Sequence, residues 1–453
     1  MRTIQEPSGM TIKILGKSRA SEAGFRWMTY VLSRDVEDGV LLFHTLTREL
    51  LLLTREEYAN PDATPELREK WFRVPAEMDD RKYADQVRFV RRTMRKKPEH
   101  ITNYTIFTTT DCNARCFYCY EMGRSRIPMT EETAHKAAAY IAAHCGDKKR
   151  VTIQWFGGEP LFNKKVIDVI CEDLAILGVQ YHSSIISNGY LFDEETVRQA
   201  VKLWKLTRVQ IALDGTEEVF NRCKAFIYKD GPSPYRVVMD NIGRLLDAGI
   251  RVNVRMNMDN HNAEDLFALA EELHQRFAGK DNLTAYSHVL FEFSGSKAHI
   301  REEEDRHNLY RKQQLLRRKL TGYGLWNTAR LRWDMPTNYC MADSDKALTI
   351  LPNGELGLCE HYTEDNFVGH IDREELDESV RQSFREEWAP IEACKTCFFY
   401  PECIRLRKCR EQRECFPEIQ EKVRQDILDG MEKAYAEWLG KEEPGQEDLL
   451  SPC

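Results

Sequence analysis

The chain has no long hydrophobic run. Its 453 residues contain no stretch of about eighteen apolar residues, so we expect no transmembrane helix. The first residues, MRTIQEPSGMTIKILGK, lack the charged and then apolar pattern of a signal peptide. The chain also has no excess of positive charge, because 65 Lys and Arg face 73 Asp and Glu, and a net charge of -8 argues against bulk nucleic-acid binding. We expect a cytoplasmic protein with no membrane or nucleic-acid partner.

Cysteine, in contrast, is abundant. Ten of the 14 cysteines fall in two clusters, and in a chain without an export signal such clusters indicate metal or redox chemistry rather than a disulfide framework. Cys145, Cys171 and Cys223 lie outside the clusters, and we interpret them as structural. The histidines lack ligand spacing and are interpreted as packing or surface residues. The length suggests two or three domains.

The first cluster lies in the segment NYTIFTTTDCNARCFYCYE, residues 103–121. Its β-branched and aromatic start predicts a strand that leads directly into Cys112, Cys116 and Cys119. Three thiolates at spacing C-x3-C-x2-C can hold three irons of a [4Fe–4S] cube and leave the fourth iron free, whereas most clusters have four cysteines. The alternative is a zinc knuckle, although zinc sites usually show paired C-x2-C units.

This spacing, with the aromatic Tyr118 before the third cysteine, resembles the motif of the radical S-adenosylmethionine (SAM) superfamily. The resemblance implies that the free iron binds the amine and carboxylate of SAM. It also implies that an electron from the cluster cleaves SAM to a 5′-deoxyadenosyl radical. The implied cofactors are therefore SAM and a SAM-binding [4Fe–4S] cluster.

Residues 103 to about 320 alternate strand and helix patterns, which predicts an α/β fold with parallel pairing. The resemblance implies a partial (β/α)6 barrel. Three expected strands end in Gly157-Gly158-Glu159, Ser187-Asn188 and Asp214, and the C-terminal strand ends are where such barrels place their chemistry.

In the resembled family the Gly-Gly-Glu motif holds the SAM amine. A double glycine also lets a ligand approach the backbone closely. Ser187 and Asn188 could hydrogen-bond the SAM ribose, and Asp214 is similarly placed, but each could equally be an ordinary turn residue. Many relatives have serine where this chain has Ala212, so one expected hydroxyl is missing. We assign no catalytic side chain.

The second cluster contains Cys340, Cys359, Cys394, Cys397, Cys403, Cys409 and Cys415. Its spacing resembles that of the SPASM domain, a two-cluster extension of radical SAM enzymes that act on peptides and proteins. The family pattern is C-x9-15-G-x4-C followed by C-x2-C-x5-C-x3-C and a last, distant cysteine. The match holds through Cys403 and departs at the last two cysteines. The alternative is a zinc ribbon.

The crossed pattern of that family implies two auxiliary [4Fe–4S] clusters. Cys340, Cys359 and Cys409 would share the first, and the second would be held by Cys394, Cys397, Cys403 and Cys415. Two fully ligated cubes need about eight thiolates, and the region offers seven. We therefore predict a free iron in the first auxiliary cluster, open to a substrate thiolate. A water, Asp343 or Cys453 could fill that position instead.

The N-terminal region reads as three strands, FRWMTYVL, VLLFHTL and RELLLLT, then two short helices that Thr54 and Thr64 can cap. Residues 1 to about 20 show no strong pattern and are interpreted as an arm. This order resembles the winged-helix-like RiPP recognition element, which binds a leader peptide as an added strand on a sheet edge. A plain capping subdomain of the barrel is the alternative.

A basic segment then runs from Arg81 to Lys97. We interpret it as a solvated linker helix with one docked face, and the alternative is an electrostatic track for an acidic leader. The domains we expect are a leader-binding domain at 1–80, a linker helix at 81–102, a barrel at 103–325, a SPASM domain at 326–438 and a mobile tail at 439–453.

The function we predict is radical modification of a ribosomally made precursor peptide, through a thioether or carbon–carbon cross-link. An electron donor such as a flavodoxin or ferredoxin would be needed. An anaerobic sulfatase-maturing enzyme, which makes formylglycine, shares the barrel and the SPASM domain and is the second hypothesis. A non-enzymatic iron–sulfur electron carrier or zinc-bound scaffold is the third.

Overall fold

A computed structural model describes the chain except residues 17–19, 94–98, 122–123, 229, 291–302, 327–329, 335–339, 362–366, 407, 409–414, 416 and 443–453. The chain divides into two compact units. The first unit comprises residues 1–96, 328–339 and 387–453, and the second comprises residues 97–327 and 340–386. Within the described residues, no helix combines the length and apolar character needed to cross a membrane.

The second unit is built on a sheet of nine described strands in the order β12-β11-β10-β9-β8-β7-β13-β14-β15. Six of them are parallel and follow chain order: β7 (Asn103–Thr109), β8 (Arg150–Gly157), β9 (Gln180–Ser187), β10 (Leu206–Ala212), β11 (Arg251–Met258) and β12 (Leu283–Val289). The predicted α/β fold with six parallel strands is confirmed.

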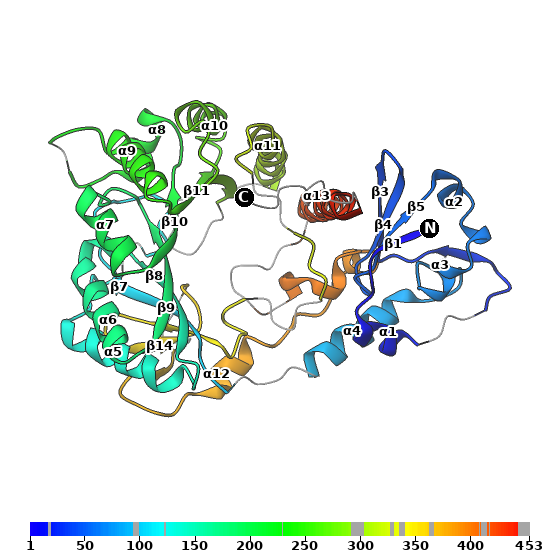
Figure 1. Cartoon of the computed structure of the whole chain (residues 1–453), viewed down its shortest axis with the longest axis horizontal. Coiled ribbons are helices and arrows are strands. Elements are labelled where there is room, and N and C mark those ends of the chain that lie inside the picture. The colour runs from blue at the N-terminus through cyan, green and yellow to red at the C-terminus, as the bar shows by residue number, and fades with distance from the viewer. Residues whose placement is uncertain are drawn as a thin grey trace, which may run out of the picture. The chain divides into compact units, whose positions relative to one another are not determined.

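Helices follow the strands and lie along the sheet, as Figure 1 shows for α5, α6, α7 and α9. The helices of this unit are α5 (Glu131–His144), α6 (Lys164–Ile176), α7 (Glu194–Lys202), α8 (Glu217–Lys224), α9 (Pro234–Asp247), α10 (Asp265–Arg276), α11 (Glu303–Gly322) and α12 (Glu378–Ser383), with the short 3-10 helix η2 (Pro160–Asn163). In α5, helical spacing predicts a buried face with Ala134, Ala137 and Ala138, and all three are fully buried. In α7, the same spacing predicts burial of Val201, but this residue is 43% exposed.

Three further strands extend the sheet beyond β7. They are β13 (Ala347–Ile350), β14 (Glu355–Gly357) and β15 (Phe367–His370). β13 pairs parallel to β7, and β14 and β15 follow as antiparallel strands. The turn between β13 and β14 contains Gly354 at φ 88, a left-handed conformation that glycine adopts without steric cost. Part of the range expected for a separate cysteine-rich domain thus completes the barrel sheet.

The first unit contains a four-stranded antiparallel sheet in the order β1-β5-β4-β3 and a two-stranded sheet, β2-β6. These strands are β1 (Arg2–Gln5), β2 (Phe25–Trp27), β3 (Val31–Val36), β4 (Gly39–His44), β5 (Leu50–Leu53) and β6 (Arg73–Pro75). The helices are α1 (Gly9–Leu15), α2 (Arg55–Ala59), α3 (Glu66–Glu69), α4 (Asp80–Thr93) and α13 (Pro417–Glu442), with the 3-10 turns η1 (Pro61–Ala63), η4 (Glu392–Cys394), η5 (Tyr400–Glu402) and η6 (Ile404–Leu406).

Strands β4 and β5 are buried along their whole length because both faces of the sheet are covered. Leu42 and Leu51 pack against Phe72 on one face. On the other face, Leu41 and Phe43 belong to a core with residues of α13, which lies beside β3 (Figure 1). The continuous apolar run of the sequence therefore reflects a sheet buried on two sides.

Three predictions for this region are wrong. Residues 1–20 are not an arm, since β1 pairs with β5 and closes that edge of the sheet. The segment FRWMTYVL is two strands, β2 and β3, because the chain turns where the N–H of Thr29 donates to Asp80. Thr64 does not cap α3, whose N-cap is Pro65. The predicted cap at Thr54 is confirmed, and together with Glu57 it forms a capping box.

The basic helix α4 is also less solvated than predicted. Arg88 and Arg91 are 5% and 7% exposed, so they belong to the docked face with Val87. The sequence pattern missed this because a long cationic side chain is normally assigned to water. Arg88 is hydrogen-bonded to backbone carbonyls of residues 400–403.

Candidate active site

The loop after β7 carries the first cysteine cluster. Thr109 accepts from the N–H of Asp111, and Asp111 accepts from the N–H of Cys112, so the loop turns sharply at the strand end. The N–H of Arg115 donates to the carbonyl of Lys224 at 2.8 Å, which ties the loop to the end of α8. Cys112, Cys116 and Cys119 are half-buried and line one cavity. The structure thus brings the three predicted thiols together.

Burial disfavours the ionised form of these thiols. It raises the pKa of Cys112 to about 12 and that of Cys119 to about 11. Burial also raises the pKa of Cys116, against the lowering effect of the Lys224 ammonium. A bound metal supplies the positive charge that deprotonates a coordinating thiol. The donor set therefore fits a cationic centre better than three free thiols.

Two glycines allow β7 and β8 to approach at this point. A Cβ on Gly157 would lie 2.1 Å from the carbonyl oxygen of Thr109, and one on Gly158 would lie 2.3 Å from that of Asp111. Gly157 also has φ 131, a backbone conformation that favours glycine. Both residues line the cavity through their backbone.

The carboxylate of Glu159 faces the neighbouring strand. It is fully buried and accepts from the Ser187 hydroxyl at 2.9 Å, the Asn188 N–H at 2.7 Å and the Leu161 N–H at 3.1 Å. Burial raises its pKa to about 7, against these hydrogen bonds. Glu159 thus holds the end of β9 in place, and the part of the Gly-Gly-Glu motif that reaches the cavity is the glycine backbone.

Ser187 and Asn188 line the cavity at the end of β9. The Asn188 amide donates to the side-chain oxygen of Asn113 at 2.6 Å and approaches the Cys112 sulfur at 3.8 Å. The Asn113 side-chain nitrogen is buried and has no hydrogen-bond partner among the described residues. These amides border the cysteine loop, where they could contact a polar ligand.

Tyr118 is held by a buried ionic network. Its hydroxyl donates to Asp214 at 2.6 Å and accepts from the Lys224 ammonium at 2.6 Å, and that ammonium lies 2.9 Å from Asp214. The Asn257 amide donates to Asp214 at 3.0 Å and to the Tyr118 hydroxyl at 3.1 Å. Asp214 therefore lies behind Tyr118 and orients the aromatic ring that precedes Cys119.

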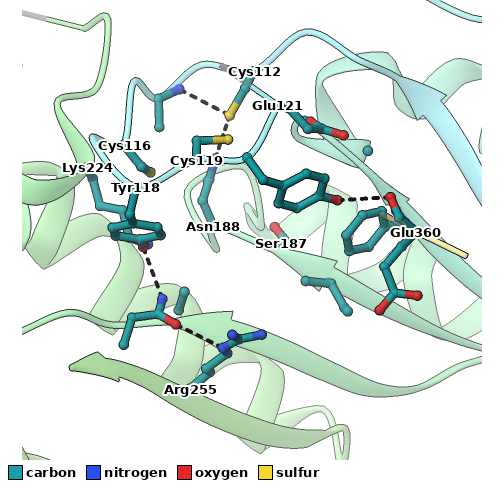
Figure 2. A pocket seen from close by; sticks show the side chains of 18 of the residues that line it. Cys112, Cys116, Tyr118, Cys119, Glu121, Ser187, Asn188, Lys224, Arg255 and Glu360 are labelled. Atoms are coloured by element: carbon teal, nitrogen blue, oxygen red, sulfur yellow. Dashed lines mark hydrogen bonds between the residues drawn. The ribbon is translucent and has the colours of Figure 1, made fainter. Parts of the chain in front are cut away.

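The cavity has a volume of about 690 Å³, within the range of small-molecule sites. Figure 2 shows the cysteines at one end and Arg255 and Glu360 at the other, with Ser187 and Asn188 between them. Tyr120 donates to the Glu360 carbonyl at 3.4 Å, and its ring lies 4.4 Å from that of His361. Within the part of the chain that the structure describes, the Oε1 atom of Glu121 is buried without a hydrogen-bond partner.

Sequence reasoning missed Lys224, Arg255, Asn257 and Glu360. Arg255 and Asn257 had a usable signal, because polar residues alternate along RVNVRMNM and face one side of a strand. The Arg255 Nε donates to Asn257 at 2.9 Å inside the cavity wall. Lys224 and Glu360 had no such signal, since Lys224 is the last residue of a short helix and Glu360 lies in an irregular segment after β14.

Comparison with known proteins finds a family model that matches the segment carrying most of the cavity residues. Residues 106–273 match the Radical SAM superfamily. Over these residues the chain is similar to that superfamily. The chain is 28% identical over 160 residues to a probable GTP 3′,8-cyclase of Archaeoglobus fulgidus, a match that covers 35% of this chain and 49% of the relative. It is 30% identical over 113 residues to an uncharacterised protein of Methanocaldococcus jannaschii, covering 24% and 37%.

Solved structures share the fold over more of the chain. Native anSMEcpe with bound AdoMet and Cp18Cys peptide aligns with a TM-score of 0.54 at 15% identity, over 75% of this chain and 99% of that chain. Streptococcus suis SuiB bound to S-adenosylmethionine aligns with a TM-score of 0.51 at 13% identity, over 83% and 94%. At these identities the likeness establishes the fold.

A radical SAM domain implies a [4Fe–4S] cluster and SAM, and the residues present fit both. Three thiols, the glycine backbone and the amide of Asn188 border one cavity. Among the described residues, no three His, Cys, Asp or Glu side chains are grouped to hold a single metal ion. Thiols spread around a cavity suit a cluster several atoms wide.

The remaining cysteines divide between the two units. Cys394, Cys397, Cys403 and Cys415 lie in the first unit and line a second cavity of about 230 Å³. Cys340 and Cys359 lie in the second unit, and Cys409 is outside the described residues, so the ligand set of the first auxiliary cluster stays a prediction. Cys145, Cys171 and Cys223 are buried, as expected of structural residues.

Proposed function

We propose that this protein is a radical SAM enzyme that modifies a ribosomally made precursor peptide, by a thioether or carbon–carbon cross-link. The observation that carries the proposal is the convergence of Cys112, Cys116 and Cys119 on the cavity lined by the Gly157 and Gly158 backbone. The shared fold of anSMEcpe, whose structure contains a bound peptide, supports a peptide substrate.

The cluster and SAM, when bound, would supply the 5′-deoxyadenosyl radical that abstracts a substrate hydrogen. The three cysteines would hold the cluster, and Asn188 and the glycine backbone would hold SAM. The network of Tyr118, Asp214 and Lys224 would fix the loop. Arg255 and Glu360, on the opposite wall, would position the reacting side chain and help to exclude water.

We also propose that the first unit binds the leader peptide. Among the described strands, β3 pairs only with β4, so its outer edge offers backbone groups to an added strand. The other edge predicted from a three-strand unit is covered by β1. Leader binding at an edge separates substrate selection from the chemistry at the radical SAM cavity.

A SAM-cleavage assay tests the enzyme proposal. The protein reduced with dithionite should form 5′-deoxyadenosine from SAM, and replacing Cys112, Cys116 and Cys119 with Ala should abolish it. Cys145→Ala removes a thiol outside the cavity and is the matched control. Unchanged 5′-deoxyadenosine formation in the triple variant would end the radical SAM interpretation.

Mass spectrometry of co-expressed peptides separates the two enzymatic hypotheses. A small cysteine-rich peptide encoded beside this gene should lose hydrogen and gain a cross-link. The anaerobic sulfatase-maturing alternative is supported by the fold of anSMEcpe and predicts formylglycine in a sulfatase-derived peptide. The N-terminal sheet favours the leader-dependent reaction. A formylglycine product without any cross-link would decide for the alternative.

A further inference from the structure

The four thiols of the first unit share one cavity, and the segment that carries three of them has no α-helix or strand among its residues 394–406. Cys394, Cys397, Cys403 and Cys415 line it together with Trp388, Tyr400 and Leu406. The segment from Cys394 to Leu406 contains short 3-10 turns joined by irregular backbone. Such turns leave many carbonyl groups without partners inside their own element, and these must be satisfied from elsewhere. Contacts with other elements must therefore hold the loop in the conformation that brings its thiols together.

Two arginines of helix α4 donate hydrogen bonds to carbonyl groups of this loop. Arg88 donates to the carbonyls of Tyr400 at 3.0 Å, Pro401 at 3.3 Å and Cys403 at 3.3 Å. Arg81 donates to the carbonyl of Cys394 at 3.0 Å, and its guanidinium lies 3.4 Å from the ring centroid of Tyr400. Two of the four cysteines are thus held by their own backbone oxygens.

The guanidinium of Arg88 is fixed in turn. It makes two bonds to Glu387, at 3.1 Å and 2.6 Å, and the Arg88 side chain is 5% exposed. A paired, planar guanidinium presents its remaining donors in a rigid direction, which an ammonium group cannot do. Arg88 can therefore act as a template for the loop as well as a charge.

The N-terminal sheet adds further attachments. Thr45, just after β4, donates to the carbonyl of Phe398 at 2.8 Å, and Arg48 pairs with Glu402 at 2.5 Å with both side chains buried. Met28, Tyr30, Leu46, Trp71 and Val87 form one apolar core with Cys394, Tyr400 and Leu406. The wall of the thiol cavity is thus part of the core of the N-terminal sheet.

We propose that Arg88 is a positioning residue for the four-cysteine site, and that this site forms only against the folded N-terminal sheet. Metal loading at the four thiols and the stability of the sheet are then linked, because a centre that binds only the folded arrangement stabilises everything that builds it. The inference rests on the proposed iron–sulfur function of these four cysteines. It also means that deleting the sheet to test leader binding would damage the thiol site.

The test compares Arg88→Gln with Lys82→Gln in the full-length protein. Lys82 is exposed on the same helix, so its replacement makes the same charge change away from the loop. After reconstitution, Arg88→Gln should carry about four fewer irons and sulfides per chain, which is one cluster, while Lys82→Gln matches the wild type. Unaltered iron and sulfide in Arg88→Gln would overturn the proposal.

Thiol protection gives a readout that needs neither SAM nor iron. In the metal-free chain, alkylation mapped by mass spectrometry should be several-fold faster at the four thiols of Arg88→Gln and unchanged at Cys112, Cys116 and Cys119. Arg88→Lys keeps the charge opposite Glu387, but its three donors cannot replace the two bonds to Glu387 and the three bonds to carbonyls that Arg88 makes, so it should fold and still lose iron. Wild-type iron content in Arg88→Lys would refute the positioning role.

The experiments distinguish failure of the proposed enzyme function from failure of this inference. If the wild type does not cleave SAM but Arg88→Gln still loses iron and thiol protection, the positioning role stands and the enzyme proposal falls. If SAM cleavage occurs and Arg88→Gln changes neither readout, the opposite holds. In the expected case, Arg88→Gln retains SAM cleavage without peptide, because the three-cysteine loop belongs to the other unit.

Discussion

The ammonium of Lys224 is buried, and the carboxylate of Asp214 balances its charge. The two side chains are 3% and 1% exposed. Lys224→Met should lower the free energy of unfolding by about 3–5 kcal/mol, because it leaves the Asp214 carboxylate buried without a counter-charge. Urea denaturation of the metal-free protein measures the loss.

The double variant Lys224→Met with Asp214→Asn provides the control. Removing both charges should recover much of the stability that the single variant loses, since neither partner is then left uncompensated. A double variant no more stable than Lys224→Met would show that the pair is not coupled, and that the loss comes from packing around Tyr118.

Glu159 should give the second unit a distinctive pH dependence. Burial raises its pKa from 4.5 to about 7, so the folded state binds the proton more tightly than the unfolded state. Stability contributed by the protonated form is present below pH 4.5 and falls as the pH rises towards 7. Glu159→Gln should therefore flatten the dependence of unfolding free energy on pH in this window.

The measurement is a series of urea denaturations between pH 4 and 8 on both proteins. Subtracting the unfolding free energy of Glu159→Gln from that of the wild type removes the contributions of the carboxylates that both proteins contain. A difference that does not change between about pH 4.5 and 7 would mean that Glu159 titrates at its ordinary pKa.

At the scale of elements, the outer edge of β3 makes a specific prediction for leader binding. A two-residue turn joins Val36 to Gly39, and bonded and non-bonded pairs alternate from there, which directs the N–H of Ser33 outwards. Ser33→Pro should weaken binding of a fluorescent leader peptide by about tenfold or more, because it removes one edge donor and blocks close approach of a strand.

Ser33→Ala keeps the N–H and is the matched control for loss of the hydroxyl, which Tyr58 contacts at 3.4 Å. SAM cleavage without peptide should persist in both variants. If Ser33→Pro binds the leader as well as Ser33→Ala does, then the β3 edge is not the site and the outer edge of β1 becomes the candidate.

At the scale of the whole molecule, the number of thiols limits how the clusters can be ligated. Seven cysteines in the C-terminal region are one short of the eight that two complete cubes need. We predict that the cluster assigned to Cys340, Cys359 and Cys409 has an open iron that binds the substrate thiolate. Such binding would lower the thiol pKa and favour thioether formation.

Spectroscopy of this cluster with a cysteine-containing peptide checks the prediction. The signal should change with the cysteine peptide and not with its Cys→Ser analogue. Cys453→Ala enzyme tests whether the chain's own last cysteine fills the position. If the peptide thiol leaves the signal unchanged, or if Cys453→Ala alone opens the site, a carbon–carbon cross-link becomes the better prediction.

Local patterns in the sequence were sufficient for the parts of the protein that depend on near neighbours. The spacing of Cys112, Cys116 and Cys119 and the glycine pair at Gly157 located the cavity, because the ends of adjacent parallel strands meet at one edge. Helical stripes such as that of α5 predicted buried faces, since the period of 3.6 residues fixes which side chains share a face.

Tertiary structure decided what joins residues far apart in the chain. It paired β1 with β5 and β13 with β7, turned Glu159 towards Ser187, and placed Lys224 against Asp214. It also brought Arg88 to carbonyl groups more than three hundred residues later. The sequence could not specify these contacts, because a lone charged residue has no period and its partner is chosen by packing. The spacing of the cysteines in the sequence was enough to predict the chemistry of the thiols. The contacts that position the thiols form only in the folded chain.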